Sequence, residues 1–133
     1  MQSLHNTFFC SQNNDIVLVD PPHQEYFVTK KFKDPIPGFL VYAKTEDILE
    51  EYRDRANKRP LLVNLHGGPH GSYAPALTTL RYSLLKLGYA VLMPNFPGST
   101  GYGQKYNESA LGGIGEKDVR TIIELLDKVL TEN

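Results

Sequence analysis

The sequence predicts an α/β fold, and three observations support this prediction. The second half of the 133-residue chain alternates strand-like apolar runs with leucines at helical spacing. Each of two strand-like runs, Leu61–Leu65 and Tyr89–Met93, is followed by a glycine-rich loop. Hydrophobic residues make up 41% of the chain, which is enough for a core of ordinary composition. We therefore expect a unit of domain size that is built around a sheet.

Residues 1–59 predict short antiparallel strands followed by an exposed segment. After an irregular start over 1–15, β-prone runs occur at Ile16–Val19, Tyr26–Thr29 and Phe39–Ala43, separated by turns that contain proline. The mostly polar stretch 45–58 favours an exposed helix or a mobile insertion. We interpret 1–59 as N-terminal strands and an exposed helix or insertion that lead into the sheet of residues 60–133.

Residues 60–133 begin with a strand, a helix and a second strand. Leu61–Leu65 is largely apolar, as expected of a strand covered on both faces. Ala74–Leu87 carries leucines at spacings of three and four, and Gly88 stands where a left-handed cap belongs. The second strand, Tyr89–Met93, ends at Pro94, because proline cannot donate to a sheet ladder.

A long glycine-rich loop and an amphipathic helix complete the predicted pattern. The loop runs from Gly98 to Gly115, and Asp118 suits the first turn of the helix that follows. Six apolar residues predict the buried face of that helix: Val119, Ile122, Ile123, Leu126, Val129 and Leu130. Because the glycine-rich loops 66–71 and 98–103 both follow strand C-termini, we expect them to meet at one edge of the sheet.

Composition argues against several classes of partner. The net charge is −1, with 14 basic and 15 acidic residues, which gives no reason to expect nucleic acid as a partner. No apolar run reaches transmembrane length and the start lacks the features of a signal peptide, so we expect no membrane association and a cytoplasmic location. The single cysteine, Cys10, allows no intrachain disulfide, which favours a reducing compartment.

The glycine pair Gly67-Gly68 is the first candidate for binding chemistry. Glycines let the backbone approach a ligand closely, and backbone N–H groups held in that way stabilise an oxyanion as it forms. The alternative is a tight strand-to-helix turn that needs glycine only for a positive φ. The residues by themselves leave these two interpretations open.

Metal binding is disfavoured in the same loop. His66 and His70 are four residues apart, as in helical zinc motifs, but Gly-Gly-Pro separates them and no carboxylate lies close by in sequence. We therefore expect no metal site and no cofactor, and we expect His66 to form local hydrogen bonds that orient the loop.

Nucleotide binding by the second loop is the weaker alternative. Gly98–Lys105 has the glycine content of a phosphate loop, but it lacks the Gly-Lys-Ser/Thr ending of the P-loop. No helix pattern opens directly on the loop, so it also fails the dinucleotide-binding fingerprint.

No nucleophile accompanies the glycine pair. A nucleophile elbow has the form Gly-x-Ser-x-Gly between a strand and a helix. The chain has six serines, none with glycine at both −2 and +2: Ser3, Ser11, Ser72, Ser83, Ser99 and Ser109. The sequence therefore offers donors for an oxyanion without a group that attacks the carbonyl.

Four motifs, in this order and spacing, resemble the prolyl oligopeptidase family of serine peptidases (S9), in particular its acylaminoacyl-peptidase members. They are His66–His70 (HGGPH), Gly88–Val91 (GYAV), Asn95–Gly103 (NFPGSTGYG) and Gly115 with Asp118-Val119. The resemblance extends from about Leu61 to the C-terminus and is weak over residues 1–60.

The resemblance implies a partial α/β-hydrolase fold, comprising the N-terminal part of the sheet and ending before the nucleophile elbow. The family's serine, aspartate and histidine would then lie downstream of Asn133, so no catalytic residue is expected in this chain. The position that matches the family's oxyanion donor is Gly68, with Gly67 and His66 beside it.

The same resemblance implies part of a serine peptidase that releases N-acylated amino acids from short peptides. The expected partner is a short, N-acylated peptide substrate. The resemblance is also compatible with a homo-oligomer in the full-length parent protein. One departure matters: Pro97 stands where the family usually has Arg, so a guanidinium with five donors is replaced by a ring without an N–H. This departure favours the alternative, an inactive paralogue that acts as a non-catalytic α/β module binding a peptide or partner protein.

Overall fold

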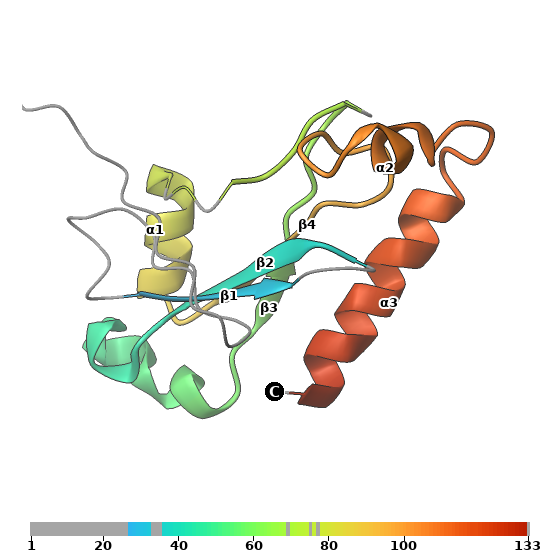
Figure 1. The fold of residues 1–133 in the computed structure, drawn as a ribbon. Helices are drawn as coiled ribbons and strands as arrows, with labels where there is room; N and C mark the ends of the chain where they lie inside the picture. The colour runs from blue at the N-terminus through green and yellow to red at the C-terminus, as the bar shows by residue number, and fades with distance from the viewer. Residues whose placement is uncertain (1–26, 33–35, 69, 75, 77, 133) are drawn as a thin grey trace, which may run out of the picture.

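The computed structural model describes residues 27–32, 36–68, 70–74, 76 and 78–132. Its centre is a four-stranded mixed sheet in the order β1-β2-β4-β3 (Figure 1). The strands are β1 (Phe27–Phe32), β2 (Gly38–Ala43), β3 (Leu61–Val63) and β4 (Ala90–Pro94). The helical elements are η1 (Thr45–Asp47), η2 (Glu50–Asn57), α1 (Thr79–Lys86), α2 (Gln104–Glu108) and α3 (Lys117–Glu132). The predicted α/β class is confirmed.

The strands of the first part of the chain join the same sheet as those of the second part. β1 pairs antiparallel with β2, and β2 pairs antiparallel with β4. β1 overlaps the predicted strand Tyr26–Thr29 but continues to Phe32, and β2 begins one residue before the predicted Phe39. The predicted irregular start 1–15, the strand Ile16–Val19 and Cys10 lie outside the described residues.

The polar stretch after β2 forms the two short 3₁₀ helices η1 and η2. Neither helix contains a buried residue, as expected of an exposed segment. Ile48, between them, is only 1% exposed and joins the core. Two long-range hydrogen bonds hold the segment, from Arg55 Nη1 to Leu87 O at 3.0 Å and from Lys86 Nζ to Asp47 O at 2.8 Å.

The prediction that Leu61–Leu65 is a strand covered on both faces is wrong in two respects. β3 ends at Val63, and its three residues are half-buried. Within the described part of the chain, β3 pairs only with β4, in parallel, so it forms an edge of the sheet. Leu65, just past the strand, is 51% exposed. The fully covered strand is β4, in which every residue is buried.

The first helix is shorter than the predicted Ala74–Leu87. α1 begins after Thr78, whose side chain accepts a hydrogen bond from the N–H of Arg81 at 3.3 Å, an N-cap that sets the start of the helix. At its end, Gly88 has φ of +82°, as predicted. Its N–H donates to Leu85 O while that of Tyr89 donates to Leu84 O, the two hydrogen bonds of a Schellman motif.

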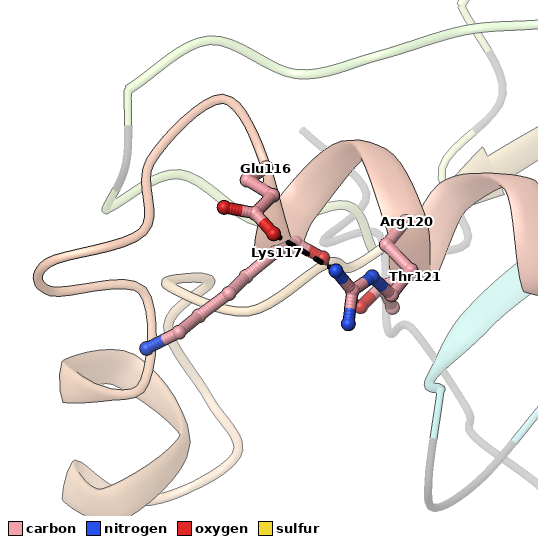
Figure 2. A network of polar contacts seen from close by, with 4 residues as sticks. All are labelled: Glu116, Lys117, Arg120 and Thr121. Carbon is pink, nitrogen blue, oxygen red and sulfur yellow. Dashed lines mark hydrogen bonds and ion pairs between the residues drawn. The ribbon is translucent and has the colours of Figure 1, made fainter.

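The start of α3 is fixed by its first polar residues. The Asp118 carboxylate accepts a hydrogen bond from the N–H of Gly115 at 2.7 Å, which confirms the predicted role of Asp118 in the first turn. Figure 2 shows the exposed ion pair between Glu116 and Arg120, at 2.8 Å, beside the hydrogen bond from Thr121 Oγ1 to Lys117 O at 2.8 Å. An exposed pair of this kind contributes little stability.

Two core clusters lie on opposite faces of the sheet. On one face Leu85 of α1 packs with Val91 and other inward side chains. On the other face Leu125 and Val129 of α3 pack with Leu92. The predicted α3 face missed Leu125, which is 1% exposed. Three of its predicted members are exposed to 48%, 51% and 63%: Val119, Ile123 and Leu130.

Candidate functional site

The two glycine-rich loops meet at the C-terminal ends of the parallel strands β3 and β4, as predicted. The N–H of Thr100, in the loop after β4, donates to Gly71 O in the loop after β3 at 3.1 Å. The Thr100 hydroxyl donates to Ser72 Oγ at 3.3 Å. Figure 1 shows these loops gathered at one end of the sheet, next to α2.

Asn95 connects these loops from the end of β4. Its side chain is fully buried, and its amide pairs with the backbone of Tyr73 as a neighbouring strand would. Oδ1 accepts from Tyr73 N at 2.7 Å, and Nδ2 donates to Tyr73 O at 3.0 Å and to the Tyr102 hydroxyl at 2.7 Å. Sequence reasoning missed Asn95, although an amide directly after a buried strand is a signal for such a role.

His66 is the second connection between the loops. Because Gly67 O can only accept, the 3.0 Å contact places a proton on His66 Nδ1. In the neutral ring Nε2 then accepts from the hydroxyl of Ser99, at 2.8 Å. Ser99 is fully buried. The imidazole also stacks on Phe96, with ring centres 4.4 Å apart and planes 14° apart.

Gly67 and Gly68 follow His66 in an exposed turn outside any helix or strand. Gly68 has φ of +111°, and a Cβ there would lie 2.8 Å from the backbone nitrogens of His70 and Gly71. Only glycine fits this position without strain. A Cβ on Gly67, in contrast, would meet nothing within 4 Å, so the space beside it is open to an approaching group.

The two histidines of the first loop are engaged separately. The Nδ2 of Asn107, on α2, donates to Gly98 O at 2.8 Å and lies 2.9 Å from His70 Nδ1. His66 bonds instead to Ser99. Among the residues that the structure describes, no three His, Cys, Asp or Glu side chains form a group that could hold a metal ion.

One argument against nucleotide binding is wrong, because a helix does open directly on the second loop. α2 begins at Gln104, immediately after Gly103, within the stretch that was expected to be loop. It is only five residues long, and its Asn107 turns back to bond the carbonyl of Gly98.

Two tyrosines beside the loops stay in the neutral form. Burial raises the pKa of Tyr102, and the hydrogen bond from Asn95 opposes this only in part. Burial likewise raises the pKa of Tyr73, against the opposing effect of Arg81. The Arg81 guanidinium lies 5.0 Å from the centre of the Tyr73 ring and donates to Ala76 O.

Backbone hydrogen bonds hold the loop after β4, in which Pro97 stands where the resemblance led us to expect an arginine. Pro97 is half-buried at that position. The N–H of Ser99 donates to Phe96 O at 3.0 Å, and that of Gly98 donates to Tyr106 O at 3.1 Å.

No helix in the described ranges is both long enough and apolar enough to cross a membrane.

The sheet order, with one parallel pair and glycine turns at its C-terminal end, defines a partial α/β-hydrolase fold. A solved acylaminoacyl peptidase from Pyrococcus horikoshii shares this fold, with a TM-score of 0.63 and 24% identity over 81% of this chain and 17% of that chain. Residues 75–133 match the sequence model described as the prolyl oligopeptidase family (peptidase S9). Over this stretch the chain is similar in sequence to the prolyl oligopeptidase family.

The curated relatives with similar sequences include several acylamino-acid-releasing enzymes. The enzyme of Rattus norvegicus is 41% identical over 73 residues, which are 55% of this chain and 10% of that enzyme. Acylamino-acid-releasing enzyme 1 of Oryza sativa subsp. japonica is 38% identical over 85 residues, 64% of this chain and 11% of that enzyme. The chain thus spans about a tenth of the length of these relatives.

Proposed function

We propose that this chain is part of a serine peptidase and that the backbone N–H of Gly68 supplies half of its oxyanion hole. In α/β-hydrolases one donor comes from the loop after the third strand, and the other from the residue after the nucleophilic serine. Gly68 occupies the corresponding loop, after β3, in an exposed turn with positive φ. This position is the observation that carries the proposal.

The catalytic serine, histidine and aspartate would come from polypeptide outside this sequence. The serine attacks the scissile carbonyl, the histidine takes its proton, and the aspartate orients the histidine. Negative charge then develops on the carbonyl oxygen, which the Gly68 N–H stabilises. The open space beside Gly67 lets the substrate approach the backbone, and the His66–Ser99 hydrogen bond fixes the loop that carries both glycines.

The substrate class follows from the relatives. Because several of the curated relatives are named acylamino-acid-releasing enzymes, we assign to the parent protein the release of N-acylated amino acids from short peptides. This chain contributes one wall of that site.

The DNA that follows the Asn133 codon in the source genome provides the first test. A reading frame that continues into Gly-x-Ser-x-Gly supports the proposal, and its longer product is then assayed on an N-acetylated amino-acid p-nitroanilide. A fluorophosphonate probe, which labels activated serines, should label the longer product but not the 133-residue chain. Labelling of the 133-residue chain would contradict a nucleophile outside this sequence.

Gly68→Ala in the longer product tests the oxyanion donor. The new Cβ would collide with the backbone nitrogens of His70 and Gly71, so the turn must rearrange and redirect the N–H. Loss of one such donor lowers kcat by about 10²–10³-fold. Gly112→Ala is the matched control, because Gly112 also has positive φ, with open space around it. Equal activities of the two variants would contradict the role of Gly68.

A non-catalytic module is the second candidate, and Pro97 is the observation that favours it. The ring of Pro97 cannot supply the donors of the arginine that the family usually has there. If the longer product binds an N-acetylated peptide but resists the fluorophosphonate probe, this alternative replaces the peptidase.

A further inference from the structure

A second candidate site lies at the opposite end of the parallel strands from the glycine loops. A cavity of about 440 Å³, here called the basal cavity, opens between η2, the last turns of α3 and the first residues of β3 and β4. Leu61 and Ala90, the first residues of these two strands, line it, whereas Gly67 and Gly68 follow the far end of β3. The basal cavity therefore cannot be part of the site described above.

The wall of the basal cavity is mostly apolar. Leu40 and Leu61 line it from the sheet, and Val129 and Leu130 line it from α3. Its volume falls within the range of small-molecule sites, which is roughly 300–1,000 Å³. Such a surface suits a hydrocarbon chain, because contact removes apolar area from water.

The charge in the basal cavity is positive. Lys58 and Arg59 both line it, and among the described residues its lining includes no Asp or Glu. The Arg59 guanidinium lies 5.2 Å from the centre of the Tyr42 ring, which forms another part of the wall. An anion that enters the cavity would therefore meet two cations from the described lining.

Arg59 also has a donor without an acceptor. Its Nη1 is buried and has no hydrogen-bond partner among the described residues. Burial lowers the pKa of Arg59, which shows that the charged form is held in an unfavourable environment. A buried donor without a partner is costly, so a turn of the guanidinium toward a carboxylate in the cavity, with a charge-assisted hydrogen bond, would be favourable.

We propose that the basal cavity binds a small monocarboxylate with an apolar tail, of the medium-chain fatty acid class. The carboxylate pairs with the Arg59 guanidinium at the cavity wall, with Lys58 nearby, and the tail packs against the leucines and Val129. A phosphate or a free inorganic anion fits less well, because it would leave the apolar wall uncovered. This inference does not rest on the proposed peptidase function.

Binding of decanoate to the 133-residue chain tests the proposal, followed by saturation-transfer difference NMR, which tolerates self-association of the protein. Decanoate should bind, and decanol, which has the same tail without the charge, should bind at least about tenfold more weakly. Arg59→Gln should weaken decanoate binding by a similar factor. Arg120→Gln is the matched control, since it removes the same charge at an exposed position at the other end of α3 (Figure 2); it should bind as the unchanged protein does.

A second variant separates the cavity from charge attraction alone. Ala56→Phe keeps both cations and fills part of the basal cavity, so decanoate binding should fall; because Ala56 also packs against the core, the melting temperature is measured for the same variant. Equal binding of decanol and decanoate, or full binding by either Arg59→Gln or Ala56→Phe, would overturn the proposal. If a variant melts early, the comparison of decanol with decanoate on the unchanged chain decides the question.

Discussion

At the scale of single residues, the candidate site is organised by a few side chains that bond across long stretches of sequence. Ser99 bonds to His66, 33 residues earlier, and Asn95 bonds to the backbone of Tyr73, 22 residues earlier. Gly68 and His66 could be selected from the sequence, because a glycine pair after an apolar strand is a local pattern. The bonding partners of Asn95 and Ser99 could not, because these partners become neighbours only when the two loops meet.

The His66–Ser99 hydrogen bond should contribute measurably to stability. Ser99→Ala removes the hydroxyl and leaves His66 Nε2 without its buried partner, so the free energy of unfolding should fall by about 1 kcal/mol in urea denaturation. Hydrogen exchange at the Thr100 N–H, which bonds to Gly71 O, should become faster because the loops are less firmly joined.

Ser83→Ala provides the control for this prediction. The Ser83 hydroxyl donates to Thr79 O on the exposed side of α1, at 3.0 Å, so its removal should change stability by less than about 0.5 kcal/mol. If the two alanine variants lose the same free energy of unfolding, the His66–Ser99 hydrogen bond contributes no more to stability than the exposed Ser83–Thr79 bond.

At the scale of elements, the sequence predicted the kinds of helices and strands better than their extents. The leucines of 74–87 have helical spacing, yet α1 starts only at Thr79, because Asn95 pairs with the backbone of Tyr73 and Thr78 caps the helix. In α3 the apolar residues form a stripe wider than the face that packs on the sheet, with Leu125 and Ile123 at its two edges, so periodicity could not distinguish the buried Leu125 from the exposed Ile123. Tertiary contacts decide both cases.

The close packing of β2 against β4 and α3 depends on a glycine in β2. A Cβ at Gly38 would lie 2.9 Å from Met93 O in β4 and 3.1 Å from Leu125 Cδ2 in α3. Because the Cβ would also lie 3.0 Å from Pro94 Cα, Gly38→Ala should force β2 and β4 apart and displace the Leu125 side chain, lowering the free energy of unfolding by about 1–3 kcal/mol. Gly67→Ala, where a Cβ meets nothing within 4 Å, should cost much less in the same denaturation experiment. Equal losses of unfolding free energy in the two variants would show that the structure accommodates a Cβ at Gly38 without strain.

At the scale of the whole molecule, the sequence predicted the layers but not the strand order. Alternating strands and helices indicate a sheet with helices packed on it, and α1 and α3 do cover opposite faces (Figure 1). That β4 lies between β2 and β3 depends on which strand can be covered on both faces. The all-buried β4 satisfies this requirement, and the half-buried β3 takes the edge.

The exposed apolar surface predicts that the 133-residue chain self-associates. Val119 and Ile123 of α3 are 48% and 51% exposed, one turn apart on the same side of the helix. In the described part of the chain, β3 also has only one paired edge, and an unpaired strand edge invites association. Light scattering coupled to size exclusion should show a mean mass well above the monomer mass of 15.0 kDa, rising with concentration.

A double variant identifies the surface that associates. Val119→Lys with Ile123→Lys places two charges on this side of α3 and adds +2 to the net charge, so the mean mass should fall toward that of the monomer. Glu124→Lys is the matched control: it also adds +2, on the exposed side chain of Glu124, but leaves Val119 and Ile123 in place, so the protein should remain associated. If both variants dissociate to the same extent, net charge and not the apolar surface governs association. If the unchanged chain is monomeric at every concentration, the prediction of self-association is wrong.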